Sequence, residues 1–229
     1  MLNNIIRLTP ILLLACLPLS CGGGGGSDHL NPETREPGTG ELSEYNGIKL
    51  FSTIELRENS IKGPQKIDMT QWRLEITGLV NNPRSYTYEE LRDRPTLKRV
   101  IWLHCVDGWS AKLLWEGFKL RDLLDEAGIQ NTATHAKFYG YDGFKNWLSL
   151  NFIQVQDVMV ATNANGLPLR VDRGYPLQVI SEGKYGYKWC KWLVKIELTN
   201  NVENFGDYEN SGYPVDGVVG SSYYKPIEY

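Results

Sequence analysis

The feature that most constrains this fold is a succession of short apolar segments separated by Gly, Pro and Asp turns. Segments of this length, with alternating or continuous apolar residues, are typical of strands. The predicted strands are residues 72–79, 100–106, 137–141, 148–150, 158–161, 177–181 and 193–198. The sequence therefore predicts an α+β fold: a mixed, strand-dominated single domain built around a sheet or a curled barrel.

Helices are predicted to be few and short. Residues 87–91 have the pattern of an N-cap followed by a short helix. Residues 118–127 place four apolar side chains on one helical face, and Gly128 follows as a C-terminal stop.

The pattern of the first forty residues indicates an export signal and a tether rather than part of the folded domain. Residues 1–7 carry one positive charge, and residues 8–19 are apolar. That apolar stretch is too short to cross a bilayer, which takes about 20 residues. We expect residues 1–20 to be a signal peptide, residues 21–40 a flexible Gly-rich tether, and residues 41–229 one domain.

Two cysteines lie near the predicted cleavage site. Cys21 follows Leu and Ser and precedes five glycines, which resembles a lipoprotein cleavage site, so we expect lipidation at Cys21. Cys16, preceded by Leu-Leu-Ala, is the alternative site, and a plain secretory signal with incidental cysteines is a third interpretation. All three place the domain outside the cytoplasm, on the periplasmic side, and lipidation anchors it to a membrane.

Charge excludes one class of partner. The formal net charge is −3, and no long basic run is present. A protein that binds the phosphate backbone needs clustered Lys and Arg, so we expect no nucleic-acid partner.

The two remaining cysteines, Cys105 and Cys190, form a possible disulfide in an oxidising compartment. We expect no such bond. Cys190 lies in residues 187–198, where even positions of a strand would line one buried face, and a small buried hydrophobe explains it. Cys105 lies in the segment LHCVDGWS, residues 103–110, which favours a metal ligand over a buried apolar cysteine.

Three ordered blocks carry a resemblance to a known family: residues 103–110, 166–177 and 184–192. They resemble the molybdopterin-binding domain of the sulfite oxidase family, which includes the exported methionine-sulfoxide reductase catalytic subunits. The similarity runs from about Leu50 to Leu198. It implies the family's mixed α+β fold and one molybdenum ion held by molybdopterin, with one cysteine thiolate as protein ligand. A soft thiolate suits such a sulfur-rich site.

Carried over by position, Cys105 is the molybdenum ligand and the catalytic centre. The pterin carries a phosphate and many hydrogen-bonding edges, so its pocket needs cations and backbone N–H groups. Trp189 to Lys191 occupies the family's phosphate-anchoring tripeptide, with Lys191 the first choice. The predicted cofactor-binding residues are Arg57, Glu58, Gly143, Arg173, Gln178, Lys184, Gly186, Lys188, Trp189, Cys190 and Lys191. Without the resemblance, this Lys-rich segment would be a solvated turn.

Two positions depart from the family pattern. Arg173 stands where relatives have His or Asn, and Gln178 stands where relatives commonly have an arginine that contacts the cofactor. Arg and Gln differ in charge and donor number, which changes the detailed contact. Residues 57–59 match the family's early cofactor loop loosely, and Asp142 with Gly143 matches a middle loop near the metal. A surface turn explains both of these segments equally well.

The resemblance implies an oxidoreductase, and we expect oxygen-atom transfer on an S-oxide, an N-oxide or a sulfite-like substrate. Sulfite would need several cations, and none is placed beyond those assigned to the cofactor. The chain ends shortly after Leu198, without the family's haem and dimerisation domains. We therefore expect electrons to be exchanged with a separate protein, a cytochrome or a quinone-linked membrane subunit.

The C-terminal tail is rich in aromatic residues, which either close the substrate funnel or form a strap on the sheet. They are Phe205, Tyr208, Tyr213, Tyr223 and Tyr224. Trp109 and Tyr208 are the candidates for the substrate side.

Two rival functions remain. One is a cofactor-free lipoprotein that uses the fold as a binding module, in which case Gln178 reflects loss of the cofactor. The other is a zinc hydrolase using His104 and Cys105. It is disfavoured because adjacent strand residues point to opposite faces and no ligand cluster is near.

Overall fold

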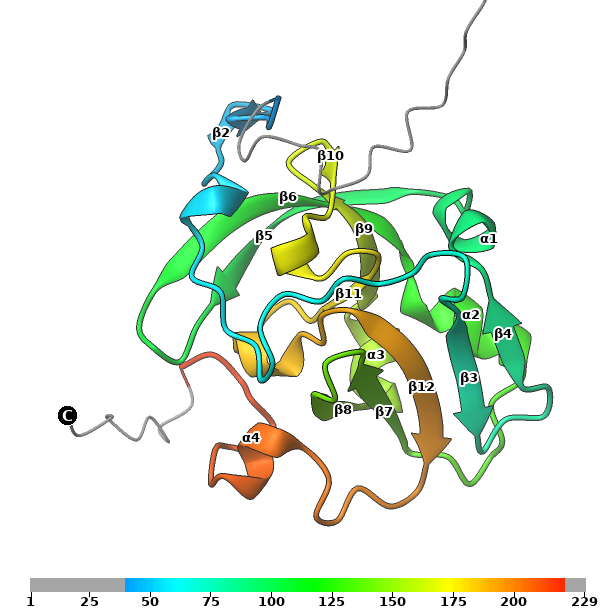
Figure 1. The fold of residues 1–229 in the computed structure, drawn as a ribbon. Helices are drawn as coiled ribbons and strands as arrows, with labels where there is room; N and C mark the ends of the chain where they lie inside the picture. Colours follow the sequence, from blue (N-terminus) through cyan, green and yellow to red (C-terminus); the bar gives the residue numbers. More distant parts are fainter. Residues whose placement is uncertain (1–39, 221–229) are drawn as a thin grey trace, which may run out of the picture.

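The computed structural model describes residues 40–220. Two five-stranded sheets form its body, and a small hairpin lies at the N-terminal side (Figure 1). The predicted signal peptide, both candidate lipidation sites and nearly all of the predicted tether lie outside the described residues, as do Tyr223 and Tyr224. Between residues 40 and 220 no helix has the length and apolar character to cross a membrane.

The first sheet has the strand order β10-β9-β6-β5, with β11 also paired to β9. All of its pairings are antiparallel. Its strands are β5 (Leu97–His104), β6 (Ser110–Lys119), β9 (Met159–Ala164), β10 (Leu167–Pro168) and β11 (Gln178–Ile180). In Figure 1 this sheet curves across the top of the molecule.

The second sheet has the order β4-β3-β12-β7-β8, in which β12 runs parallel to β3 and the other neighbours are antiparallel. It lies below the first sheet in Figure 1. Its strands are β3 (Leu74–Gly78), β4 (Arg84–Tyr86), β7 (His135–Gly140), β8 (Lys145–Ser149) and β12 (Leu193–Thr199).

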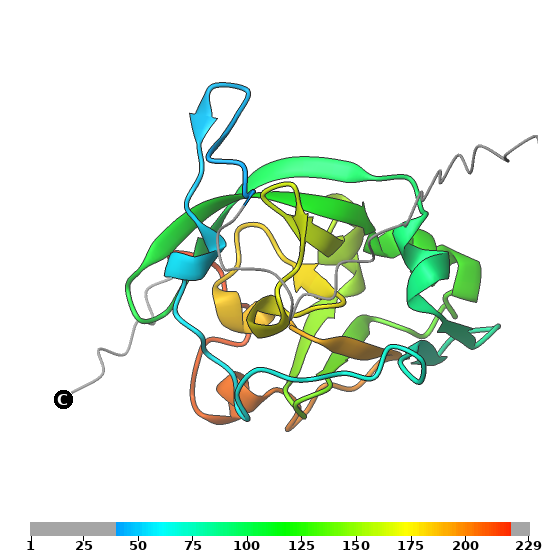
Figure 2. The ribbon, with the colours of Figure 1, turned by 45° about the horizontal axis from the view of Figure 1, so that its top comes forward.

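Helices are short and connect or cover the sheets. They are α1 (Tyr88–Arg92), α2 (Leu120–Ala127), α3 (Leu150–Val155) and α4 (Asp207–Asn210), with 3₁₀ turns η2 (Thr53–Glu55), η3 (Val171–Arg173) and η4 (Gly186–Lys188). The hairpin of β1 (Glu44–Tyr45) and β2 (Ile48–Lys49) stands out from the body in Figure 2. This strand-dominated arrangement is the fold class that the sequence predicts.

Local sequence signals set the helix ends as expected. The Thr87 hydroxyl accepts from the Glu90 backbone N–H at 3.3 Å, and the Glu90 carboxylate accepts from the Thr87 backbone N–H at 2.7 Å. This reciprocal capping box fixes the start of α1. Gly128, with φ of 71°, ends α2 in the left-handed conformation that glycine adopts without strain.

Several predicted boundaries differ from those of the structure by a few residues, and strand β6 and helix α3 are among the elements that were not predicted. Residues 118 and 119 belong to β6 rather than to a helix, because Phe118 and Lys119 pair with Val160 and Met159 of β9. Strand β6 is buried on both faces for most of its length, so it lacks the alternation that marks a half-buried strand. Residues 187–192, which were considered as part of a buried strand, instead begin in η4, and Trp192 has φ of 50°; the strand starts at Leu193, as the predicted strand 193–198 does.

The core divides into two clusters. The larger packs the second sheet against α2 and α3, with Ile76, Ile196 and Leu124 among its buried side chains. The smaller packs the inner side chains of β5, β6 and β9 against Trp189, whose ring meets that of Trp115 edge-on at 5.7 Å. The smaller cluster supports one wall of the site described below.

Gly117 permits a close approach of β6 to β9. The pairing register shifts between Glu116 and Gly117, and a Cβ atom at residue 117 would overlap the carbonyl oxygen of Val160. A methyl group there forces the two strands apart, which moves Trp115 and the site wall with it.

We expect Gly117→Ala to lower the free energy of unfolding by about 1–3 kcal/mol, the usual cost of overpacking, as measured by chemical denaturation. Gly47→Asn is the control: its φ of +77° suits Asn, and a Cβ there meets no atom within 4 Å. The control should cost less than about 1 kcal/mol. Equal stabilities of the two variants would contradict the close approach.

Candidate active site

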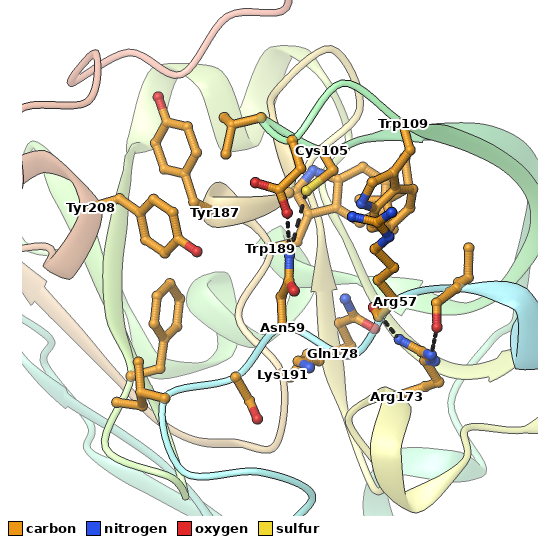
Figure 3. Close-up of a pocket in the computed structure, with 18 of the residues that line it drawn as sticks. Arg57, Asn59, Cys105, Trp109, Arg173, Gln178, Tyr187, Trp189, Lys191 and Tyr208 are labelled. Carbon is orange, nitrogen blue, oxygen red and sulfur yellow. Dashed lines mark hydrogen bonds between the residues drawn. The ribbon is translucent and has the colours of Figure 1, made fainter. Parts of the chain in front are cut away.

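A cavity of about 340 Å³ lies where the end of β5, turn η4, residues 56–61 and helix α4 meet (Figure 3). Most of the predicted site residues line it. They are Arg57, Cys105, Trp109, Arg173, Gln178, Gly186, Trp189, Lys191 and Tyr208. Segments that are far apart in the sequence are therefore brought together around one space, as the three-block motif implies.

Cys105 is the first residue after β5 and begins a tight turn. Its backbone N–H donates to the Trp109 carbonyl at 2.9 Å, and its carbonyl accepts from Gly108 N–H at 3.2 Å. The thiol is free rather than disulfide-bonded. Asn59 Nδ2 donates to Cys105 Sγ at 3.5 Å and to the Asp107 carboxylate at 3.1 Å (Figure 3). The sulfur is thus held on the cavity wall by backbone and side-chain contacts.

The electrostatic surroundings of Cys105 favour the protonated thiol. Burial raises its pKa above the ordinary value, and the negative charge of Asp107 acts in the same direction, against hydrogen bonds from the Asp107 backbone and Asn59 that lower it. A positive ion bound at the sulfur reverses this balance, because a coordinated thiol is deprotonated.

Arg173 holds a neighbouring backbone segment, residues 53–57, through hydrogen bonds to three carbonyl oxygens; we call this contact the Arg173 clamp. Its guanidinium donates to the carbonyl oxygens of Thr53 at 3.1 Å, Arg57 at 2.7 Å and Leu56. The side chain is largely buried, and burial lowers its pKa. These bonds hold residues 53–57 against η3 and so place Arg57 and Asn59 at the cavity. Direct binding of the cofactor by Arg173 stays a prediction.

Lys191 lines the cavity with its charge partly compensated. Its Nζ lies 2.6 Å from the Glu58 carboxylate and 4.5 Å from the centre of the Trp192 ring. Burial lowers the pKa of Lys191, while Glu58 opposes that shift. Glu58, a predicted cofactor residue, therefore contributes here as the partner of Lys191 and does not itself line the cavity.

Four other predicted residues also lie away from the cavity lining. Lys184 Nζ donates to the Asp216 carbonyl at 2.6 Å, and Lys188 forms a buried ion pair with Glu209. Cys190 is fully buried in the larger core cluster. Gly143, with φ of +90°, forms the β7–β8 turn, in which its neighbour Asp142 lines the cavity.

The structure adds residues that the sequence reasoning did not select. Asn59 and Asp142 belong to segments that resemble the family's loops. In those segments, their neighbours Arg57, Glu58 and Gly143 were the predicted cofactor residues. Tyr187, Tyr213 and Phe144 form an aromatic wall with Tyr208. The sequence signal that could have identified these residues is their position next to a matched motif. The direction of a side chain in a turn cannot be predicted from the hydrophobic periodicity.

The cavity fits a cofactor with a soft metal and many polar edges. Among residues 40–220, the buried indole N–H groups of Trp109 and Trp115 have no hydrogen-bond acceptor, although both rings line the cavity. A Cβ on Gly186 would lie 3.3 Å from the Leu103 side chain, so the backbone there is close-packed. A cavity of 300–1,000 Å³ is usual for such ligands. Fold and site thus define a domain whose cavity suits a metal–organic cofactor and carries the free Cys105 thiol on its wall.

Comparison with protein families matches residues 61–205 to the oxidoreductase molybdopterin binding domain. The chain belongs to this family. It is a molybdopterin-binding oxidoreductase, and molybdenum with molybdopterin is its cofactor. The predicted family, fold class and cofactor are confirmed.

Sequence similarity to known proteins extends over much of the chain. The uncharacterized oxidoreductase YuiH of Bacillus subtilis is 31% identical over 156 residues, covering 67% of this chain and 78% of that protein. The protein-methionine-sulfoxide reductase catalytic subunit MsrP of Gluconobacter oxydans is 28% identical over 222 residues, covering 84% and 69%. The sulfane dehydrogenase SoxCD of Paracoccus pantotrophus shares the fold, with a TM-score of 0.58 at 24% identity over 61% of this chain and 41% of that one.

We expect Arg173→Lys to lower the free energy of unfolding by about 2 kcal/mol or more, because lysine cannot reach three carbonyl oxygens and hydrogen bonds to charged groups are each worth about 1.5–3 kcal/mol. The molybdenum content of the purified protein should fall with it, since residues 56–59 shape the cavity.

Arg170→Lys is the matched control. Arg170 bonds to Asp172 at 2.8 and 3.1 Å at a partly exposed position. A pair of that kind is worth at most about 1 kcal/mol. If both substitutions had the same effect on denaturation and on metal content, Arg173 would not be the clamp.

Proposed function

We propose that this protein is an exported, lipid-anchored enzyme that reduces an S-oxide substrate at a molybdopterin site, with electrons supplied by a separate redox protein. The observation that carries the proposal is the cavity itself. One of its walls presents the free Cys105 sulfur, and another consists of neutral aromatic side chains.

Cys105 is the residue that would hold the molybdenum, through its thiolate. Arg57, Lys191 and the Gln178 amide would hold the polar and anionic parts of the pterin, and the free indole N–H groups would donate to its edges. Gln178 lines the cavity from β11, so the departure from the family arginine replaces a charge by a neutral donor and acceptor. When bound, the group supplies two-electron redox chemistry and oxygen-atom exchange.

The charges of the cavity favour a neutral substrate over the sulfite dianion. Lys191 is paired with Glu58, the Arg173 guanidinium is engaged by backbone carbonyls, and Arg57 is assigned to the anionic part of the pterin. Two carboxylates, Asp107 and Asp142, also face the cavity. A dianion would need surplus cations, whereas the aromatic wall suits the apolar substituents of a thioether S-oxide. N-oxides share this neutral character.

Relatives support the substrate class and the separate electron donor. Two similar proteins are named protein-methionine-sulfoxide reductase catalytic subunits, and a catalytic subunit implies a second component. The chain spans 62% of one of them, the Campylobacter jejuni protein. We assign the partner as a cytochrome or quinone-linked membrane subunit. Lipidation at Cys21 would keep the domain on the periplasmic side of the membrane beside that partner.

The ligand assignment predicts a metal phenotype. Loaded wild-type protein, made in a host with an intact cofactor pathway, should carry about one molybdenum per chain, and Cys105→Ser should lose the metal or all activity. His104→Gln is the control, because His104 Nδ1 bonds to the Ser110 hydroxyl and its ring stacks on Trp102. Elemental analysis measures the molybdenum content of each variant, and pterin fluorescence measures its cofactor content.

A well-folded wild type free of molybdenum and pterin in that host would favour the cofactor-free binding module. Loss of a different bound metal in both variants would point to a His104 and Cys105 site instead.

A substrate screen tests the reaction. With reduced viologen as artificial electron donor, we expect turnover of methionine sulfoxide and of dimethyl sulfoxide by the loaded enzyme. Trimethylamine N-oxide tests the related N-oxide class. Oxidation of sulfite with an artificial acceptor, at a kcat/KM above that for both sulfoxides, would overturn the charge argument.

A further inference from the structure

One part of the surface concentrates large hydrophobic side chains. Between residues 40 and 220 ten such side chains are exposed, and half of them are Trp102 or lie in residues 42–54. Trp102 and Phe51 are 43% and 44% exposed, and their ring centroids are 6.1 Å apart. Single exposed hydrophobic residues are common, whereas grouped ones mark interaction sites.

Strand geometry places this group on the outer face of the first sheet. Trp102 of β5 pairs with Lys112 of β6, while the adjacent pair Ile101 and Leu113 is buried in the smaller core cluster, because successive side chains point to opposite faces. Lys112 Nζ lies 4.8 Å from the centre of the Trp102 ring, and the Lys112 carbonyl accepts from Phe51 N–H at 2.9 Å. We call Phe51, Trp102 and Lys112 the Trp102 patch.

The patch carries a positive charge without a counter-charge. Within the described part of the chain Lys112 forms no ion pair; its ammonium group lies over the Trp102 ring instead. The neighbouring lysines are compensated: Lys98 pairs with Glu116 at 2.7 Å, and Lys49 stands opposite Glu44 in the hairpin. A partner surface with an apolar centre and acidic groups around it would complement this pattern.

The patch also lies close to the predicted metal ligand. The His104 ring stacks on the Trp102 ring, with centroids 6.0 Å apart and planes 20° apart, and Cys105 follows directly on the cavity wall. Three residues of extended chain span about 10 Å. A redox group docked on Trp102 would thus be near Cys105, and a short separation favours electron transfer.

The described chain begins beside this patch. The Glu41 carboxylate accepts hydrogen bonds from the Ser52 hydroxyl at 2.7 Å and the Thr53 backbone N–H at 3.0 Å, and these are the two residues after Phe51. Cys21, the proposed lipidation site, precedes Glu41 by 20 positions. A flexible chain of about 20 residues spans about 25 Å on average. A lipid at Cys21 would therefore hold the patch near the membrane.

We propose that the Trp102 patch is the docking surface for the electron donor, a membrane-bound redox subunit reduced by quinol, whose own docking face is apolar at its centre and acidic at its rim. This role rests on the proposed function, which needs such a donor. Transient redox complexes bury little surface, less than about 1,200 Å². A single exposed tryptophan at the centre then contributes much of the binding energy.

The patch positions the donor and takes no part in the redox chemistry. A quinol loses two electrons and two protons and becomes a quinone. The S–O bond of the sulfoxide breaks, the sulfur takes up the two electrons and becomes a thioether, and the oxygen leaves with two protons as water. The patch therefore affects the supply of electrons and leaves the reaction with a small artificial donor unchanged.

The first test compares two electron sources in one preparation. Loaded full-length protein is produced in a source strain that lacks its own copy of the gene, and right-side-out membrane vesicles are prepared. Added quinol drives methionine sulfoxide reduction through the membrane donor, whereas reduced viologen drives it directly. We expect Trp102→Ala and Lys112→Glu to lower the quinol-driven rate about tenfold or more, with the viologen-driven rate within about twofold of wild type.

Two variants control this comparison. Lys137→Glu makes the same charge change in β7 of the second sheet, where Lys137 Nζ lies 4.6 Å from the centre of the Phe205 ring. It should leave both rates within about twofold of wild type, since a charge outside the interface has little effect on docking. Trp102→Phe keeps an aromatic surface and should restore part of the quinol-driven rate that Trp102→Ala loses.

The second test detects contact rather than activity. The photoreactive residue benzoylphenylalanine is placed at position 102 in the same vesicles. The control position is 155, where Val155 is 68% exposed at the end of α3. After illumination, we expect position 102 to cross-link to a membrane protein that carries haem or flavin, detected by haem staining or flavin fluorescence. Position 155 should give no such adduct.

The outcomes separate this role from the proposed function. Quinol-driven rates of Trp102→Ala and Lys112→Glu equal to wild type overturn the docking role. Cross-links from position 102 to lipid alone, or to a second copy of this chain alone, assign the patch to the membrane surface or to self-association and overturn it too. A wild type active with viologen but inactive with quinol refutes the membrane donor. A loaded wild type that reduces no S-oxide with viologen refutes the proposed function, and the cross-link then still identifies what covers the patch.

Discussion

The grip of Arg173 on the backbone of residues 53–57 is the interaction on which the site depends. A guanidinium carries five N–H donors in a planar fork, which suits several carbonyl oxygens at once. Its burial is tolerable because those oxygens and Asp172 compensate the charge. Through these bonds an early segment is held beside η3, and Arg57 and Asn59 come to face Cys105.

Most of the charge around this site is arranged in pairs, which is the basis of the substrate preference that we propose. Lys191 faces Glu58, Lys188 faces Glu209, and Arg173 faces carbonyl oxygens and Asp172. Each cation meets a local requirement of the fold, so few remain to attract a free dianion. Neutral donors such as the indole N–H groups and the Gln178 amide would then provide the recognition that we propose. They are directional and weakly dependent on ionic strength, unlike exposed charges.

Much of this could be predicted from the sequence, because ordered motifs report which backbone segments meet. Cys105, Gln178 and Lys191 do line one cavity. Side-chain direction was less accessible. Lys188 and Lys191 are three residues apart, yet Lys188 contacts Glu209 of α4 and Lys191 lines the cavity, because the chain leaves the 3₁₀ turn between them. Strand β6 was missed since burial on both faces removes the alternating pattern.

The cavity lining comes from two parts of the chain. Cys105 and the cavity-lining residues matched to the family precede residue 192, whereas Tyr208 and Tyr213 follow the end of the family match. A substitution in residues 206–213 would therefore act first on the aromatic wall, and on the predicted cofactor residues only through the contacts of Tyr187 and Lys188 with this segment.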